Sequence, residues 1–191
     1  IHFFNENDGI AIGDPPLWTD GYSEYLILTT NDGGNTWLEV GAENGVPNVI
    51  GSYGYLGNWD AIGDHIWYPV FSPEDSTTNT VILHSSNRGY NWVTLPVPND
   101  FSESSVYVTF RNENDGFMSD YDGGSSVSYD GGQTWSDPVY HDYDLRNPRC
   151  AKGTDIIFAT HNSGHEIIRS DDWGGNLVFT GRNRSCQSLE L

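Results

Sequence analysis

The sequence predicts an all-β fold assembled from repeated antiparallel sheets, because a short turn motif recurs along it and its composition suits strands joined by frequent turns. The 191 residues include 22 Gly, 9 Pro, 7 Trp and 11 Tyr. Such a composition is typical of all-β domains with many turns. No segment shows the apolar periodicity of an amphipathic helix or the length of a transmembrane helix. We therefore expect a single β-structured region spanning residues 1–191.

An eight-residue motif of the form [Ser/Thr]-x-[Asp/Asn]-x-Gly-x-x-[Trp/Leu] occurs four times, beginning at residues 30, 85, 128 and 170. A pattern that repeats every ~40–50 residues indicates β-propeller blades, each a sheet of four strands. The shared positions are Thr30, Asp32, Gly34 and Trp37; Ser85, Asn87, Gly89 and Trp92; Ser128, Asp130, Gly132 and Trp135; and Ser170, Asp172, Gly174 and Leu177.

Each copy of the motif lies between two strand-like runs and is expected to form the turn of a β-hairpin. The Asp or Asn side chain accepts hydrogen bonds from backbone N–H groups in its own turn. The Gly two positions later supplies a positive φ angle without a Cβ clash. The Trp is expected to fold back over the hairpin and bury its ring. These roles are structural, so the carboxylates of the motif are poor candidates for catalysis.

The motif resembles the Asp-box, or BNR repeat, of sialidases, sortilin-type receptor domains and photosystem-assembly propellers. The segments Phe3–Pro15 and Phe110–Met118 resemble segments that precede the Asp-box hairpin in photosystem-stability-factor-like proteins. The resemblance covers nearly the whole chain and implies an Asp-box β-propeller. It does not define an activity, because one fold hosts unrelated functions.

We expect about four blades, at residues 1–45, 46–100, 101–142 and 143–181. Residues 182–191 resemble the start of the fourth blade and are expected to begin a fifth. The chain is then expected to be a segment of a ring of six to eight blades, whose open edges other chains complete. The alternative is a compact four-bladed ring with a trailing tail. The expected innermost strands are His2–Phe4, Tyr55–Ile62, Val106–Arg111 and Arg149–Lys152.

The charge of the chain restricts its partners. There are 27 acidic and 8 basic residues, giving a formal net charge of −19. Such a field repels the phosphates of nucleic acids and anionic membranes, so neither nucleic-acid binding nor membrane insertion is expected. An acidic surface of this kind keeps a secreted or surface-displayed, extracellular protein soluble. The expected partners are protein or carbohydrate.

Two further features bear on metals and on covalent bonds. Asn5–Gly9 and Asn112–Gly116 resemble the start of a calcium loop, although neither has the downstream Glu of an EF-hand, and both fit hairpin turns. Calcium is therefore one option, and no other cofactor or metal site is expected. Cys150 and Cys186 occupy matching places in adjacent blades and are a candidate disulfide.

The first functional hypothesis is a non-catalytic interaction or assembly module. Aromatic residues beside amide and carboxylate groups suit recognition of sugars or peptides. The segment Gly57–Pro69 is the richest in such residues, and Trp59, Trp67 and Tyr68 are its candidate binding residues. Packing of one blade against the next is the competing explanation for these rings.

The second hypothesis is a glycoside hydrolase, sialidase-like or of another Asp-box family, with its site in the central funnel. Such a site would use arginines to hold a substrate carboxylate, because the guanidinium fork pairs with it through two bonds. Arg111, Arg149 and Arg184 lie on or near successive inner strands and are the candidates. No catalytic residue is singled out, since the chain has too many acidic residues for spacing to select a pair.

Overall fold

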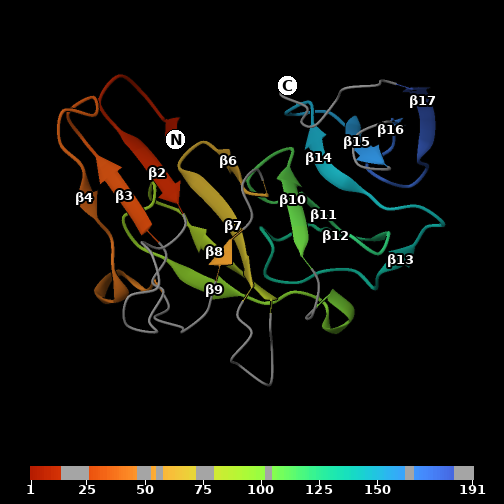
Figure 1. Cartoon of the computed structure of the whole chain (residues 1–191), viewed down its shortest axis with the longest axis horizontal. Helices are drawn as coiled ribbons and strands as arrows, with labels where there is room; N and C mark the ends of the chain where they lie inside the picture. The colour runs from red at the N-terminus through yellow and green to blue at the C-terminus, as the bar shows by residue number, and fades with distance from the viewer. Residues whose placement is uncertain are drawn as a thin grey trace.

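The computed structural model describes residues 1–13, 26–46, 53–54, 58–71, 80–101, 105–161 and 166–182. They form four antiparallel sheets in chain order, which confirms the all-β propeller architecture (Figure 1).

The first sheet contains β1 (His2–Phe3), β2 (Gly9–Gly13), β3 (Leu26–Thr30) and β4 (Leu38–Glu39). The second contains β5 (Tyr53–Gly54), β6 (Asp60–Ile62), β7 (His65–Phe71), β8 (Thr80–Ser85) and β9 (Val93–Leu95). The third contains β10 (Val106–Phe110), β11 (Gly116–Asp120), β12 (Gly124–Ser128) and β13 (Val139–Tyr140). The fourth contains β14 (Arg146–Cys150), β15 (Ile157–His161), β16 (Glu166–Ser170) and β17 (Val178–Arg182).

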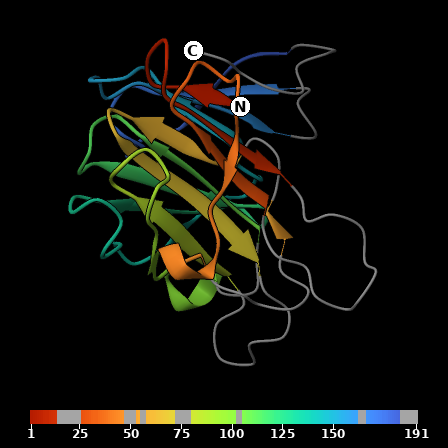
Figure 2. The ribbon, with the colours of Figure 1, turned by 90° about the vertical axis from the view of Figure 1, so that its left-hand side faces the viewer.

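The strands of the first, third and fourth sheets follow one another as a meander, and in the second sheet β6 pairs with β7 beside the path β5-β7-β8-β9. The sheets pack against one another in the order of the sequence. Figure 1 shows the first sheet at one end of the row and the fourth at the other, and Figure 2 looks along the row with the first sheet nearest the viewer. Two short 3-10 helices, η1 (Ala42–Asn44) and η2 (Asn99–Phe101), lie at the same end of the sheets in both views.

Three details differ from the expected strands. The innermost position of the second sheet is shared by two short strands, β5 and β6, which both pair with β7. Of the expected strand Tyr55–Ile62, residues 55–57 lie outside the described residues, and the strand within the rest is Asp60–Ile62. In the fourth sheet the innermost strand is Arg146–Cys150 rather than Arg149–Lys152, and its pairing register shifts between Arg146 and Arg149. Arg182 was expected to begin a fifth blade, but it pairs with Glu166 at the end of β17.

Consecutive sheets are joined by hydrophobic clusters at three places, which we call the first, second and third seams in chain order. A four-stranded sheet has too little area to bury a face alone, so each gains its core from the neighbouring sheet. Strands β10 and β11 of the third sheet are buried along their whole length because they lie between two seams. Fully buried members are Ile10, Ile27, Ile66 and Leu83 at the first seam; Trp67, Ile82, Phe101, Val108, Phe110 and Met118 at the second; and Leu145, Ile157 and Ile168 at the third.

The four motif copies form hairpin turns with a common hydrogen-bond pattern, and we call them box turns one to four. In box turn one the Thr30 hydroxyl donates to Asp32 at 2.8 Å and accepts from the Gly34 N–H at 3.0 Å. The Asp32 carboxylate also accepts from the Thr36 N–H at 2.9 Å. The same bonds occur at Ser85, Asn87 and Asn91; Ser128, Asp130 and Thr134; and Ser170, Asp172 and Asn176.

One carboxylate connects three consecutive sheets. Asp60 in β6 accepts hydrogen bonds from the Phe110 N–H at 2.7 Å and the Thr109 hydroxyl at 3.0 Å, both in β10. The Lys152 ammonium, which follows β14, donates to the same oxygen at 2.5 Å. The Asp60 side chain is 12% exposed and that of Lys152 is 42% exposed. The second, third and fourth sheets are therefore linked through one partly buried acceptor.

We predict that Asp60→Ala lowers the free energy of unfolding by about 3 kcal/mol, because it leaves the buried Phe110 N–H without its acceptor and the Lys152 ammonium without its counter-charge. Urea unfolding followed by tryptophan fluorescence measures the change. Asp171→Asn is the matched control: Asp171 pairs with Arg169 at the surface and is 65% exposed, so the control is expected to change stability by less than about 0.5 kcal/mol. Equal effects of the two substitutions would contradict the prediction.

We predict that box turn one loses stability in acid through Asp32. Hydrogen bonds from Thr36, and then from Thr30, lower the pKa of Asp32 from 3.8 to about 2. A depressed carboxyl pKa means that the stabilisation is complete above pH 3.8 and is lost as the pH falls through about 2. Asp32→Asn should keep the turn, since Asn87 makes the same backbone bond, and should be less sensitive to pH between about 4 and 2. Urea midpoints at pH 5 and pH 2.5 test this, and an unchanged acid sensitivity would contradict it.

Candidate binding site at the second seam

The fourth residue of every box turn contacts a second turn in its own sheet. The N–H groups of these residues donate to the carbonyl groups of the turns that precede β2, β7, β11 and β15, at 2.8–2.9 Å. All four residues have positive φ angles, of 72°, 62°, 77° and 55° in chain order. The donor and acceptor pairs are Gly33 and Asn7, Arg88 and Asp64, Gly131 and Asn114, and Trp173 and Asp155. The backbone arrangement is therefore the same in the four sheets, while the side chain at the fourth position differs.

At the first seam the fourth residue of the box turn is Arg88, which carries a guanidinium. Arg88 donates through Nε to Asp64 of its own sheet at 2.7 Å, and through Nη1 to Asp8 of the first sheet. Its hydrogen bond with Asp64, the larger influence, and that with Asp8 raise the pKa of Arg88. The two carboxylates and the guanidinium thus bridge the ends of the first two sheets.

At the third seam the position carries an indole, and a guanidinium lies over it. Trp173 is buried and meets Phe117 of the third sheet edge to face, with ring centroids 6.5 Å apart. The guanidinium carbon of Arg111 lies 4.5 Å from the centroid of the Trp173 ring. Arg111 also donates to Asp115 of its own sheet, at 2.9 Å, and to Asp155 of the fourth sheet. This seam again holds a guanidinium between two carboxylates.

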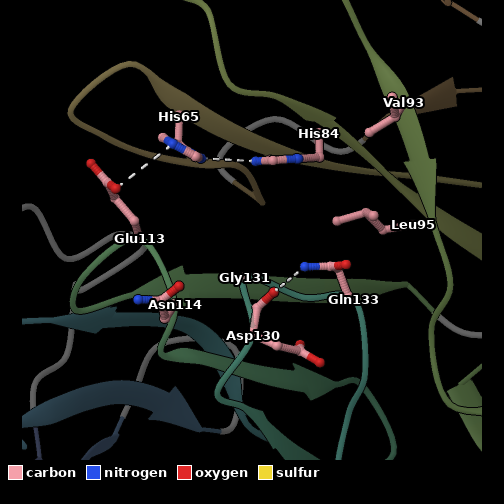
Figure 3. A pocket seen from close by; sticks show the side chains of 9 residues that line it. All are labelled: His65, His84, Val93, Leu95, Glu113, Asn114, Asp130, Gly131 and Gln133. Carbon is pink, nitrogen blue, oxygen red and sulfur yellow. Dashed lines mark hydrogen bonds and ion pairs between the residues drawn. The ribbon is translucent and has the colours of Figure 1, made fainter.

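At the second seam the position is Gly131, and a cavity of about 280 Å³ opens beside it. Figure 3 shows the cavity between the His65 and His84 side chains of the second sheet and the Asp130–Gln133 turn of the third. Neither Lys nor Arg is among the lining residues, which are His65, His84, Val93, Leu95, Glu113, Asn114, Asp130, Gly131 and Gln133. Arg88 and Trp173 fill the other two seams from the fourth position of their box turns, whereas Gly131 has no side chain to fill this one.

The wall of the cavity on the second sheet is a stack of flat rings. His65 and His84 each stack on Trp67, with ring centroids 5.5 Å and 5.2 Å from the indole. His65 Nδ1 and His84 Nε2 lie 3.1 Å apart and share a hydrogen bond, in which one nitrogen donates and the other accepts. Burial, and then the neighbouring His65, lower the pKa of His84 to about 4, so its ring is neutral near pH 7.

The opposite wall supplies a carboxylate. Glu113 lies in the turn between β10 and β11, its side chain is 61% exposed, and its Oε2 is 3.8 Å from His65 Nε2 (Figure 3). Val93 and Leu95 on β9 add apolar surface, and Val93 is 56% exposed. The cavity thus combines neutral rings, an exposed carboxylate and an aliphatic edge, an arrangement suited to a flat or cationic group.

The aromatic residues proposed for binding are placed differently from one another. Trp67 is fully buried, stacks on Phe110 with centroids 3.7 Å apart, and donates its Nε1–H to the Gly131 carbonyl at 2.8 Å. Tyr68 is 3% exposed within the first-seam cluster. The expectation that Trp67 and Tyr68 offer binding surface is therefore wrong, because both pack sheet against sheet. Trp59 is partly buried beside His2, with ring centroids 5.9 Å apart.

The three arginines proposed for carboxylate binding do not share one environment. Arg111 is held at the third seam by Asp115 and Asp155, as described above. Arg149 in β14 donates to the carbonyl of Pro148 at 2.9 Å. Arg184 lies outside the described residues. Arg88, Gly131 and Trp173 were not predicted as site residues, although they occupy the variable fourth position of the motif, which the sequence displays.

The proposed calcium and disulfide residues lie in well-defined local structures where they are described. The amide oxygens of Asn5 and Asn112 accept hydrogen bonds at 2.8 Å from backbone N–H groups of their own turns. Within the described ranges, no group of three or more His, Cys, Asp and Glu side chains is arranged to hold a metal ion. Cys150 is buried, and its thiol donates to the Phe110 carbonyl at 3.1 Å. Its pairing with Cys186 stays a prediction, because Cys186 lies outside the described residues.

Comparison with known proteins supports the fold and defines no family. No family model and no curated protein matches the sequence. Solved structures do match: YCF48 from Cyanidioschyzon merolae superposes with a TM-score of 0.54 at 17% identity, over 92% of this chain and 61% of that chain. The GH74 enzyme of Niastella koreensis gives a TM-score of 0.57 at 14% identity, over 91% of this chain and 30% of that one.

A GH74 xyloglucanase from Xanthomonas campestris is similar to the same degree, with a TM-score of 0.53 at 13% identity, over 92% of this chain and 32% of that one. All three likenesses lie below 25% identity and show the fold alone: the chain is a β-propeller structure. The chain spans less than two thirds of the length of each. In the part of the chain that the structure describes, no helix is long and apolar enough to span a membrane.

We predict that His84 makes the protein less stable in mild acid. Its pKa is 6.5 in the unfolded chain and about 4 in the folded one, so only the unfolded state binds a proton between these values. Stability therefore falls as the pH decreases from 6.5 towards 4. The urea midpoint of the wild type should drop more between pH 7.5 and pH 5 than that of His84→Gln, which has no titratable ring. Equal drops would contradict this assignment.

Proposed function

We propose that this chain is a non-catalytic binding module whose acidic surface recognises cationic protein partners. The observation that carries the proposal is the internal pairing of its basic side chains. Of the seven Lys and Arg residues within the described ranges, five form ion pairs with carboxylates, and Arg149 donates to a backbone carbonyl. The ion-paired residues are Arg88, Arg111, Arg146, Lys152 and Arg169.

This pairing has an electrostatic consequence. The chain carries 27 acidic residues against 8 basic ones, so its own basic side chains cannot neutralise its negative charge. A surface with this excess attracts positively charged partners and accelerates their association. The same excess disfavours partners with a net negative charge, including phosphate-rich ones. The partner class that fits is therefore a protein segment rich in Lys and Arg.

The state of Arg111 supports binding over hydrolysis. A sialidase-like site requires arginines whose guanidinium groups are open to a substrate carboxylate. Arg111 instead makes ion pairs with Asp115 and Asp155, and its side chain is 19% exposed. Holding a substrate would require both pairs to break. The glycoside hydrolase alternative rests on likeness of fold to GH74 enzymes, and fold alone does not define an activity.

We predict that the protein binds a fluorescein-labelled decalysine peptide and not a labelled decaglutamate peptide, as measured by fluorescence anisotropy. The affinity should fall at least about tenfold between 50 and 500 mM NaCl, because screening shortens the range of the attraction. Equal affinity for the two peptides would contradict the proposal. Hydrolysis of a fluorogenic sialoside or of xyloglucan oligosaccharides would replace it with the hydrolase alternative.

A further inference from the structure

We propose that the cavity at the second seam is a receptor for an arginine side chain of the partner protein. The inference rests on the proposed function, since it names the group through which a cationic partner engages the module. It concerns the space between His65, His84, Glu113, Gly131 and Gln133. The first and third seams each hold a guanidinium group between the ends of two sheets.

Both other seams contain a guanidinium supplied by the chain itself. Arg88 joins Asp8 to Asp64 at the first seam, and Arg111 joins Asp115 to Asp155 at the third. The four aspartates lie in equivalent turns, each immediately before the second strand of its sheet or one residue from it. A guanidinium between two sheet ends is therefore a repeated feature of this structure, and the second seam lacks one among its lining residues.

The second seam supplies the groups that a guanidinium needs. Glu113 offers an exposed carboxylate, and paired N–H groups of arginine match carboxylate geometry. Gln133 donates its Nε2–H to the Asp130 carbonyl at 2.9 Å, which leaves its amide oxygen as an acceptor. Leu95 and Val93 provide apolar contact for the methylene stem of an arginine, which packs well on aliphatic surface.

The rings explain a preference for arginine over lysine. His65 and His84 form a flat wall supported by Trp67, and a planar guanidinium stacks on such a surface whereas an ammonium does not. Burial keeps the pKa of His84 low, so at neutral pH its ring does not repel a cation. The charged or titratable groups among the lining residues are His65, His84, Glu113 and Asp130, and Asp130 is engaged in its own box turn.

The test is an NMR titration with the peptide acetyl-Gly-Ser-Arg-Gly-Ser-amide and with the same peptide carrying neutral citrulline. The Trp67 indole N–H, which donates to Gly131 at the cavity wall, and the ring protons of His65 and His84 are the reporters. The arginine peptide should shift these signals with saturation, and the citrulline peptide should bind at least about tenfold more weakly. Glu113→Gln should weaken arginine binding by about the same factor.

Gly131→Arg should remove the binding, because it places a side chain where Arg88 and Trp173 stand in other box turns. Gly33→Arg is the matched control: both glycines have similar φ angles, 72° for Gly33 and 77° for Gly131, and in each an added Cβ would lie 3.1 Å from a backbone oxygen. Gly33 does not line the cavity, so its variant should bind within about twofold of the wild type. A dispersed amide spectrum verifies folding, and Glu113→Gln decides the question if Gly131→Arg does not fold.

Shifts that map away from the cavity, or equal binding by the Gly131→Arg and Gly33→Arg variants, would overturn the arginine receptor. Equal affinity for the citrulline peptide would overturn it as well. The decalysine experiment separates this result from a failure of the proposed function. Decalysine can bind Gly131→Arg with wild-type affinity while the cavity signals of the wild type do not respond to the arginine peptide. That outcome would support the acidic binding module and overturn the arginine receptor. If decalysine does not bind the wild type, both fall.

Discussion

Burial of sheet faces is the constraint on which the rest of this structure depends. Each sheet is narrow, and its buried side chains lie in clusters that it shares with the next sheet. Stability therefore comes from the seams as much as from the sheets themselves. The ends of the seams are also where the turns of neighbouring sheets meet, so the polar chemistry of the molecule concentrates there. The ion pairs of Arg88, the ion pairs of Arg111 and the open cavity each lie where the turns of two neighbouring sheets meet.

Local features could be predicted from the sequence, and features that depend on contacts between sheets could not. The box turns form through bonds between residues two to four apart, such as Thr30, Asp32 and Gly34, so a short motif contains all the necessary information. Trp67 and Tyr68 are adjacent on β7 and point to opposite faces, yet both are buried because the strand lies between two seams. Alternation along one strand carries no sign of that double burial.

The candidate site was hidden from the sequence for a related reason. Arg111 stood out as a residue on an inner strand, but one of its partners, Asp155, belongs to the next sheet. Gly131 looked like an ordinary turn glycine, and its meaning emerges only beside Arg88 and Trp173, whose backbone makes the same bond in other sheets. A cavity produced by a missing side chain has no motif of its own. It becomes visible when equivalent positions of a repeat are compared in three dimensions.

The Asp60 contact changes how the row of sheets is expected to lose its structure. Repeat architectures are commonly treated as one-dimensional arrays, in which each unit interacts only with its immediate neighbours. Asp60 breaks that approximation, because its carboxylate binds the third sheet and also the Lys152 ammonium of the fourth. Fraying of the fourth sheet would deprive a carboxylate two sheets away of its counter-charge. The second, third and fourth sheets should then open as one cooperative unit, with the first sheet as the unit able to separate from it.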